Sequence, residues 1–395
     1  MADIKTIDDA DFAGKRVLVR VDFNAPVNDA GVVADDTRIR AALPTIEKLI
    51  ADGARVILTS HRGRPAGTGF EEAFSLGPVA RRLQELLGRD IVLSRAIVGP
   101  EAAEAVDALE DGDVLLLENI RFDAREKKND PAFARELAHL ADAYVNDAFG
   151  TAHRAHASTA GVAEFLPSYA GYLMEREVAT LTGMLDEPKR PFVAILGGSK
   201  VSDKIKVIDA LLEKADTLII GGGMCFTFLL AQGKSVGTSL KEEDWVERAA
   251  AMIEKARERG VSLLLPVDVV AADAFSNDAR TEIVSVDDMA ADMMGLDIGP
   301  ETAELYAEAI GMAKSVFWNG PMGVFEMPAF EAGTKRVAEA VAANAEADTI
   351  IGGGDSVAAV NQFDLADRMT FISTGGGASM ELVQGEALPG VEALK

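Results

Sequence analysis

Short runs of apolar and β-branched residues recur along the chain, and most are followed by a polar or glycine-rich loop and then by a segment with helical periodicity. Apolar strands that alternate with helices are typical of a parallel sheet covered on both faces. A chain of 395 residues is too long to fold around a single hydrophobic core, so the pattern predicts an α/β protein with two doubly wound parallel-sheet domains. The strand-like runs lie at residues 17–21, 56–58, 114–117, 143–146, 193–196, 217–220, 315–318, 349–351 and 370–372.

The segment between the two expected Rossmann-like domains, residues 164–186, contains no strand-like run. Its later part, residues 175–184, has helical character and ends before Pro188. We therefore expect a helical hinge in or beside this segment. A second domain boundary near the C-terminus is also compatible with the pattern.

Composition narrows the possible partners. The formal charge of −25 disfavours nucleic acid and anionic membranes, since both require a basic surface. The single Cys225 cannot form an internal disulfide, and no stretch reaches the roughly 20 apolar residues of a membrane span or the pattern of a signal peptide. These features predict a cytoplasmic protein whose anionic ligands are small.

Ligands of open α/β sheets bind at the carboxyl ends of the strands. In the first half of the chain these positions carry arginine, histidine and short polar residues, and three of the four histidines lie there. Several guanidinium groups together suit a ligand with both phosphate and carboxylate groups. The strand-end residues are Asp22, Phe23, Asn24, His61, Arg62, Gly63, Arg64, Arg121, His153, Arg154 and His156.

Arg38 adds a cation at the start of a predicted helix that Asp36 or Thr37 can cap. The alternative for each arginine is a pair with a surface carboxylate. Asp22 and Asn24 fit either a turn before Pro26 or recognition of a substrate hydroxyl. For His61 and His153 the alternative is a neutral structural histidine.

In the second half, the strand ends carry glycine clusters that precede helices. Glycine lets backbone N–H groups approach a phosphate, and a helix N-terminus adds its positive dipole end. A tight turn explains one such cluster, but repetition in one domain favours a nucleotide site. The clusters lie at residues 197–198, 221–223, 320–323, 352–354 and 375–377.

Two lysines and two carboxylates accompany these clusters. Lys200 and Lys204 lie four apart at a predicted helix start, so they are expected to face the same phosphates unless they form a solvated helix face. Asp355 is expected to be either a helix N-cap or a Mg²⁺ ligand. Glu326 is placed to accept hydrogen bonds from a ribose.

Common nucleotide-binding motifs are missing. No Gly-x-Gly-x-x-Gly spacing occurs, which disfavours a nicotinamide-dependent dehydrogenase. Gly233-Lys234-Ser235 is similar to the end of a P-loop, but Phe228 occupies the position of the first glycine.

With these residues in place, the chain resembles the phosphoglycerate kinase family over essentially its whole length. The motifs that carry the resemblance are KRVLVRVDFN at 15–24, SHRGRP at 60–65, GTAHRAH at 150–156, WNGPMGVFE at 318–326 and LPGV at 388–391. Arg62 stands where the family usually has an apolar residue and Ser199 where alanine is common, which puts only fine affinity in doubt.

The resemblance implies reversible phosphoryl transfer between ATP and the carboxylate of 3-phosphoglycerate, giving ADP and 1,3-bisphosphoglycerate, by a monomeric glycolytic enzyme with Mg²⁺ on the nucleotide. It implies a 3-phosphoglycerate domain at 1–170 plus 386–395 and a nucleotide domain at 171–385. We expect Arg38, Lys200 and Gly376 to act on the transferring group. The expected substrate site is Asp22, Phe23, Asn24, Arg38, His61, Arg62, Gly63, Arg64, Arg121 and Arg154. The expected nucleotide site is Gly198, Lys200, Lys204, Gly222, Gly295, Asn319, Pro321, Glu326, Gly353, Gly354, Asp355 and Ser356, with Asp355 as the metal ligand.

Two other functions fit parts of the pattern. A non-catalytic phospholigand-binding protein on the same fold would not need Arg38 together with two closely spaced lysines. A nicotinamide-dependent dehydrogenase would need the glycine motif that the sequence lacks.

Overall fold

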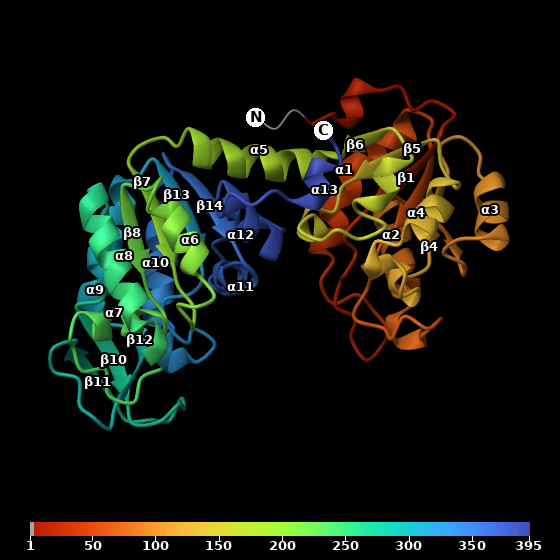
Figure 1. Cartoon of the computed structure of the whole chain (residues 1–395). Coiled ribbons are helices and arrows are strands. Elements are labelled where there is room, and N and C mark those ends of the chain that lie inside the picture. The colour runs from red at the N-terminus through yellow and green to blue at the C-terminus, as the bar shows by residue number, and fades with distance from the viewer. Residues whose placement is uncertain (1–3) are drawn as a thin grey trace. The chain divides into compact units, whose positions relative to one another are not determined.

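We describe the fold from a computed structural model, in which residues 4–395 are described. The chain forms two compact units (Figure 1). The first unit extends to Thr180 and also includes the C-terminal residues Ala387–Lys395, and the second unit is Leu181–Glu386. The boundaries thus lie at 180/181 and 386/387, where we expected 170/171 and 385/386.

The first unit contains a six-stranded, fully parallel sheet. Its strand order is β3 (Val92–Ser94), β4 (Val114–Leu117), β2 (Arg55–Thr59), β1 (Arg16–Arg20), β5 (Ala143–Asn146) and β6 (Ser168–Ala170). The carboxyl ends of β4, β2, β1 and β5 therefore lie next to one another at one edge. The helices of this unit are α1 (Thr37–Ala51), α2 (Gly77–Leu87), α3 (Pro100–Asp107), α4 (Pro131–Ala138) and α13 (Pro389–Glu392).

Local sequence signals fix the ends of several of these helices. Asp130 caps α4, because its carboxylate accepts hydrogen bonds from the amides of Ala132 and Phe133, and Pro131 provides the first helical residue. Gly88 ends α2 in the left-handed conformation. The apolar side of α1 packs through Ile39 and Ile46 on the sheet, which buries both side chains fully.

The segment between the units differs from its prediction in two respects. β6 (Ser168–Ala170) is a strand where we expected none, and it pairs in parallel with β5. Its residues, Ser168, Tyr169 and Ala170, include no β-branched side chain, so they do not form an apolar strand-like run in the sequence. The helix that follows, α5 (Tyr172–Asp186), is longer than the expected 175–184.

The second unit also has a six-stranded parallel sheet, and its helices lie on both faces (Figure 1). The strand order is β15 (Phe371–Ile372), β14 (Asp348–Gly352), β13 (Ser315–Asn319), β7 (Phe192–Leu196), β8 (Thr217–Ile220) and β9 (Ser262–Leu264). The helices are α6 (Ile205–Leu211), α7 (Cys225–Ala231), α8 (Val246–Arg259), α9 (Pro300–Met312), α10 (Ala332–Ala343), α11 (Gly354–Gln362) and α12 (Gly377–Val383).

A three-stranded antiparallel sheet in the second unit was not predicted. It has the order β11 (Thr281–Ser285), β10 (Asp268–Ala272) and β12 (Met294–Ile298). β11 is an edge strand with four of its five residues exposed, so it has no buried apolar run to detect.

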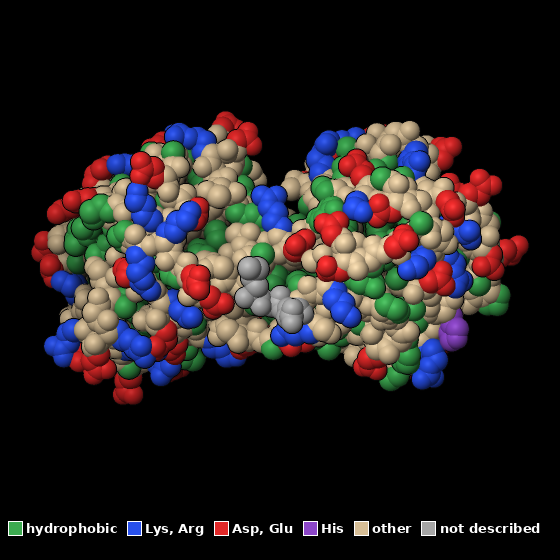
Figure 2. All heavy atoms as spheres, turned by 90° about the horizontal axis from the view of Figure 1, so that it is seen from above, with side chains coloured by type: hydrophobic (Ala, Val, Ile, Leu, Met, Phe, Trp, Pro, Cys, Tyr) green, Lys and Arg blue, Asp and Glu red, His purple; other side chains and the backbone are tan. Residues whose placement is uncertain are grey.

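Charged side chains of both signs are interspersed on the face shown in Figure 2. None of the helices formed by residues 4–395 combines the length and apolar character needed to cross a membrane.

Candidate active site

The strand-end residues of the first unit form one hydrogen-bonded cluster. Asn24 follows β1, and its Oδ1 accepts a hydrogen bond from the amide of Gly63, which follows β2, at 2.9 Å. Arg121 follows β4 and donates to the carbonyl of Gly63 at 2.9 Å. Asp22 accepts from the amide of Asn24 at 3.3 Å. The predicted convergence of three loops is therefore present.

Arg38, in the first turn of α1, forms a 2.7 Å salt bridge with Asp22. Its side chain is 42% exposed, so the guanidinium keeps access to solvent while one carboxylate orients it. Asp36 is the N-cap residue of α1, but its side chain makes no capping hydrogen bond and instead accepts from Arg40 and Arg82. The expected capping by that side chain is wrong.

His61 is 4% exposed and lies in a strongly cationic environment. Burial lowers its pKa well below the usual range, and the positive charges of Arg20, Arg121, Arg154 and Arg38 lower it further. His61 is thus neutral at physiological pH, which agrees with the alternative of a neutral structural histidine. Its position among these arginines also keeps it within the anion-binding cluster.

The charged form of Arg121 is destabilised by its surroundings. Burial lowers its pKa to about 10, with Arg20 and Arg154 adding to the effect, and its Nε is buried without a hydrogen-bond partner. An anion placed here would satisfy the unpaired donor and offset the repulsion between arginines.

The other predicted substrate residues have different surroundings. Arg64 is exposed, and no hydrogen bond or salt bridge engages it within residues 4–395. Arg154 is exposed and donates from Nε to Nε2 of His153 at 3.0 Å. Phe23 has a fully buried side chain, and Arg62 donates to the carbonyls of Ala73 and Ser75, so the structure does not bring these two side chains to the cluster. Gly63 contributes its backbone.

Sequence reasoning missed Arg20, the most deeply buried cation of this unit. Arg20 ends β1 with no exposed surface and contacts Nδ1 of His61 at 3.1 Å. Its signal was present in the sequence, because a charged residue interrupts an otherwise apolar run at residues 17–21.

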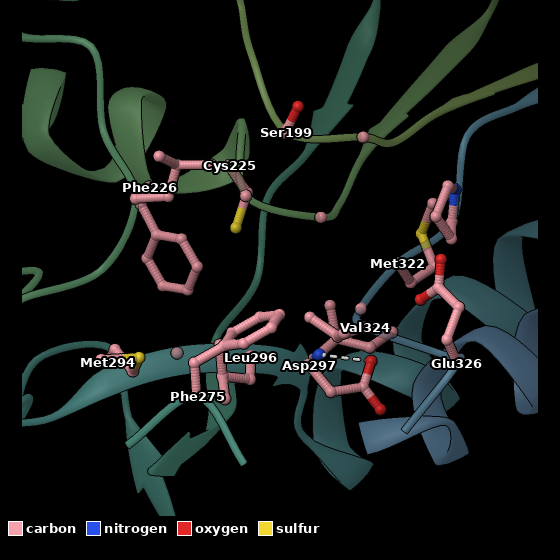
Figure 3. A pocket seen from close by; sticks show the side chains of 18 of the residues that line it. Ser199, Cys225, Phe226, Phe275, Met294, Leu296, Asp297, Met322, Val324 and Glu326 are labelled. Carbon is pink, nitrogen blue, oxygen red and sulfur yellow. Dashed lines mark hydrogen bonds between the residues drawn. The ribbon is translucent and has the colours of Figure 1, made fainter. Parts of the chain in front are cut away.

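The second unit contains an apolar cavity of about 560 Å³ beyond the ends of β7, β8 and β13. The aromatic side chains of Phe226 and Phe275 are directed toward this hollow (Figure 3), and neither residue was predicted. Of the expected residues, Gly198, Gly222, Gly295, Pro321, Glu326 and Asp355 line it. The size and lining suit a planar heterocycle.

A second, smaller cavity of about 360 Å³ shares Gly198, Ser199 and Asp355 with the first. It is lined by Lys200, Lys204 and the first residues of α11 and α12. No side chain caps either helix. The first-turn amides of α11 therefore keep free hydrogen-bonding capacity, whereas in α12 the amide of Ala378 bonds to the carbonyl of Gly375. The remaining expected residues that line it are Asn319, Gly353, Gly354, Ser356 and Gly376.

The glycines after β7, β8 and β13 have a role that we did not predict. The amide of Gly198 donates to the carbonyl of Pro321 at 3.2 Å and that of Gly222 to Met322 at 2.9 Å, so neither points at a ligand. A Cβ on Gly222 would lie 2.6 Å from the backbone of Gly198. The expectation that these amides bind phosphate is wrong, since the glycines allow the loops to pack backbone against backbone.

Two further expectations about this site need correction. Lys200 and Lys204 do not share a helix face, because α6 begins only at Ile205: Lys200 lies in the loop after β7, and Lys204 is the N-cap residue of α6. Both lysines line the same cavity. The N-cap of α11 is Gly353, so Asp355 is not the cap and its exposed carboxylate faces both cavities.

Comparison with known proteins shows the family to which the chain belongs. A family model described as phosphoglycerate kinase matches residues 7–386. The chain belongs to the phosphoglycerate kinase family. It is 59% identical over 390 residues to a phosphoglycerate kinase of Herpetosiphon aurantiacus, covering 99% of this chain and 98% of the relative, and 58% identical over 395 residues to one of Chloroflexus aurantiacus, with the same coverage.

Solved structures of the same family have the same fold. The phosphoglycerate kinase of Coxiella burnetii is 43% identical with a TM-score of 0.91, and that of Pyrococcus horikoshii is 33% identical with a TM-score of 0.84. Each comparison covers 99% of this chain and 98% of the other. The predictions of a phosphoglycerate kinase, of a phosphotransferase and of a two-domain α/β fold are confirmed, and the dehydrogenase alternative is wrong.

Proposed function

We propose that this protein transfers a phosphoryl group reversibly between ATP and the carboxylate of 3-phosphoglycerate, giving ADP and 1,3-bisphosphoglycerate. The observation that carries the proposal is the presence of one anion site in each unit, built from different groups. The first unit offers guanidinium groups and His61. The second offers an apolar cavity that adjoins two lysines and two uncapped helix starts.

The proposed substrate residues fall into two sets, according to the chemical group of the substrate that each would bind. Asp22 and Asn24 suit a hydroxyl, because each has a side-chain oxygen at the end of β1. Arg64, Arg121 and Arg154 suit phosphate oxygens, and Arg121 carries the buried unpaired donor that such a ligand would satisfy.

In the nucleotide site, the base is proposed to occupy the apolar cavity, with the ribose beside Glu326 at its rim. Lys204 is proposed to hold phosphate oxygens at the first turn of α11. Ser356 acts indirectly, because its buried hydroxyl accepts a hydrogen bond from the amide of Gly320 at 2.6 Å and so fixes that loop.

Asp355 fits the role of a metal ligand on the nucleotide. No group of three or more metal-binding side chains occurs within residues 4–395. Mg²⁺ in nucleotide enzymes is commonly held by one or two carboxylates together with substrate phosphates, and Asp355 supplies one exposed carboxylate beside the phosphate cavity. When bound, the ion would neutralise phosphate charge.

The acceptor is a carboxylate that is already ionised at neutral pH, so the reaction needs no general base. The barrier lies in bringing two anions into line and in the charge that spreads over the transferring oxygens. We assign the stabilisation of this negative charge to Arg38 and Lys200, together with the amide of Gly376. Lys200 is exposed and Arg38 is partly exposed, so both are accessible to ligands.

A coupled assay tests the proposal directly. ATP-dependent formation of 1,3-bisphosphoglycerate from 3-phosphoglycerate would be followed through oxidation of a reduced nicotinamide by a coupling dehydrogenase. Turnover is expected. Binding of both ligands without turnover would instead support the alternative of a non-catalytic phospholigand-binding protein.

Three finer expectations belong to the same proposal. We propose that the protein is a cytoplasmic monomer and that the two units approach each other when both ligands bind, with a hinge in or beside residues 164–186. Light scattering would measure the mass. Solution X-ray scattering should show a smaller radius of gyration with both ligands, and an unchanged profile would count against the hinge.

A further inference from the structure

Behind His61 lies a row of buried polar side chains that the proposed mechanism has not used. Arg20, Ser158 and Glu126 have no exposed surface. Arg20 contacts Nδ1 of His61 at 3.1 Å and donates from Nε to the hydroxyl of Ser158 at 2.9 Å. Ser158 donates to Oε1 of Glu126 at 2.7 Å.

The chemistry of these groups fixes the direction of every hydrogen bond in the row. An ionised carboxylate only accepts, so the hydroxyl proton of Ser158 points at Glu126 and its lone pair faces Arg20. A guanidinium only donates, so Nδ1 of His61 must be the acceptor. Neutral His61 therefore carries its proton on Nε2.

The surrounding charges keep this arrangement in one protonation state. Burial lowers the pKa of His61, and Arg20, Arg121, Arg154 and Arg38 lower it further, so the imidazole stays neutral. Burial alone would raise the pKa of Glu126, but contacts with His156 and Arg20 and the hydrogen bond from Ser158 leave it lowered. The Glu126 carboxylate is ionised beside His156, whose Nδ1 lies 3.3 Å away.

Tyr144 holds the middle of the row. Its buried hydroxyl donates to the carbonyl of Ser158 at 2.8 Å, which fixes the backbone that carries the serine hydroxyl. Arg20 also donates to the carbonyl of Val21. The guanidinium is thus held on three sides and cannot rotate away from His61.

We propose that Arg20, oriented by Ser158 and Glu126, is a positioning residue that presents His61 to the phosphorylated substrate as a hydrogen-bond donor through Nε2. The inference rests on the proposed function for the identity of that substrate. A neutral histidine can face a ligand with either a donor or an acceptor nitrogen, and an acceptor would repel phosphate or carboxylate oxygens. Within residues 4–395, no hydrogen bond involves Nε2, which leaves this donor for a ligand.

The ¹⁵N resonances of the histidine rings test the tautomer in the full-length protein without any ligand. The chain has four histidines, so a His61→Gln variant assigns the signals. In the wild type at neutral pH we expect a protonated Nε2 and a bare Nδ1. In Ser158→Ala and Arg20→Lys we expect both signals to shift toward the average of two tautomers.

Kinetics of the same variants test the consequence. Removing the partner that orients a metal-binding histidine typically lowers metal affinity or activity by about 10- to 100-fold. We expect an increase of the same order in the KM for 3-phosphoglycerate, with an unchanged KM for ATP. Ser94→Ala is the matched control, since Ser94 is a buried serine of the same unit that bonds only to the backbone around Ala96. It should leave both the spectrum and the kinetics unchanged.

Two results would overturn the proposal. One is a wild-type His61 protonated on Nδ1, which needs no variant to fold. The other is an unaltered tautomer in correctly folded Ser158→Ala and Arg20→Lys. If the expected tautomer is found but the coupled assay shows no turnover, the positioning of His61 is supported and the proposed function fails separately.

Discussion

Lys204 donates a hydrogen bond from Nζ to Oδ1 of Asn319, and the Asn319 amide donates in turn to the carbonyl of Gly352 at 2.7 Å. This relay ties the turn before α6 to the ends of β13 and β14. Burial lowers the pKa of Lys204, and no salt bridge neutralises it within residues 4–395. The lysine is thus held at the smaller cavity as a cation that lacks a bonded carboxylate.

The relay predicts a selective loss of nucleotide affinity. Lys204→Met should raise the KM for ATP by about 10- to 100-fold, because a hydrogen bond to a charged group is worth roughly 1.5–3 kcal/mol, and should leave the KM for 3-phosphoglycerate unchanged. Lys206→Met is the control, since Lys206 is 72% exposed and pairs with Glu386 on the surface. Equal effects of the two substitutions on ATP would refute the assignment.

Arg38 is expected to act on the transferring group and not on nucleotide binding. Arg38→Ala should lower kcat by about 10²–10³, the usual loss for one donor aimed at transition-state charge, with little change in ATP affinity. Arg40→Ala provides the comparison on the same helix, because Arg40 is exposed and pairs with Asp36. Turnover by Arg38→Ala near the wild-type rate would remove Arg38 from the catalytic role.

The convergence of the strand-end residues was predictable because strands buried on both faces appear as continuous apolar runs, as at 114–117 and 193–196, and because parallel strands end at the same edge. The direction of each side chain within a loop was not. Arg62 and Arg64 are two residues apart, yet one bonds to the carbonyls of Ala73 and Ser75 while the other faces solvent. Only the path of the folded loop separates them.

The glycine clusters show the same limit. Glycines after β7, β8 and β13 line the apolar cavity, but the amides of Gly198 and Gly222 bond to carbonyls of a neighbouring loop, and that of Gly320 bonds to the hydroxyl of Ser356. Which loop lies opposite depends on strand order, and consecutive strands of this sheet are not always neighbours: β7 lies between β8 and β13. The order of the strands in the sheet cannot be derived from the hydrophobic pattern of the sequence.

Close packing of these loops predicts that Gly197 tolerates no side chain. A Cβ there would lie 2.0 Å from the carbonyl oxygen of Pro321, and a backbone atom cannot move aside as a side chain can. Gly197→Ala should destabilise the protein by about 1–3 kcal/mol or more, the range for overpacking, and should weaken ATP binding. The check is the thermal unfolding midpoint with and without ATP.

Gly311→Ala is the control for that experiment. Gly311 lies in α9 of the same unit with open space around its Cα, so alanine should be neutral or stabilising by up to about 1 kcal/mol. A Gly197→Ala protein as stable as Gly311→Ala would show that the loops can separate at little cost.

Asp147, at the end of β5, caps the first turn of α5. Its Oδ1 accepts hydrogen bonds from the amides of Leu173 at 2.9 Å and Met174 at 3.3 Å, and Oδ2 is buried without a partner. Burial raises the pKa of Asp147 to about 7, although the nearby Thr45 hydroxyl and the two amides lower it. The carboxyl is therefore protonated in the folded protein at a pH where it is ionised in the unfolded chain.

A raised carboxyl pKa gives a definite sign to the pH dependence. The folded state binds the Asp147 proton more tightly than the unfolded state, whose pKa is about 3.9, so this contribution to stability is complete in acid and is lost as the pH rises through about 7. Asp147→Asn keeps the accepting oxygen and removes the ionisation. Its unfolding midpoint should therefore rise relative to the wild type between about pH 4 and 7 and stay constant above.

The control for this prediction has the opposite sign. The hydrogen bond from Arg16 lowers the pKa of Asp142, so its contribution is present above the unfolded pKa and is lost in acid. Asp142→Asn should thus fall below the wild type as the pH rises from acid, where Asp147→Asn rises. Asp297, whose pKa burial also raises to about 7, is present in all three proteins, so differences from the wild type isolate the substituted residue. Parallel pH profiles for Asp147→Asn and the wild type would show that Asp147 does not titrate between its two expected values.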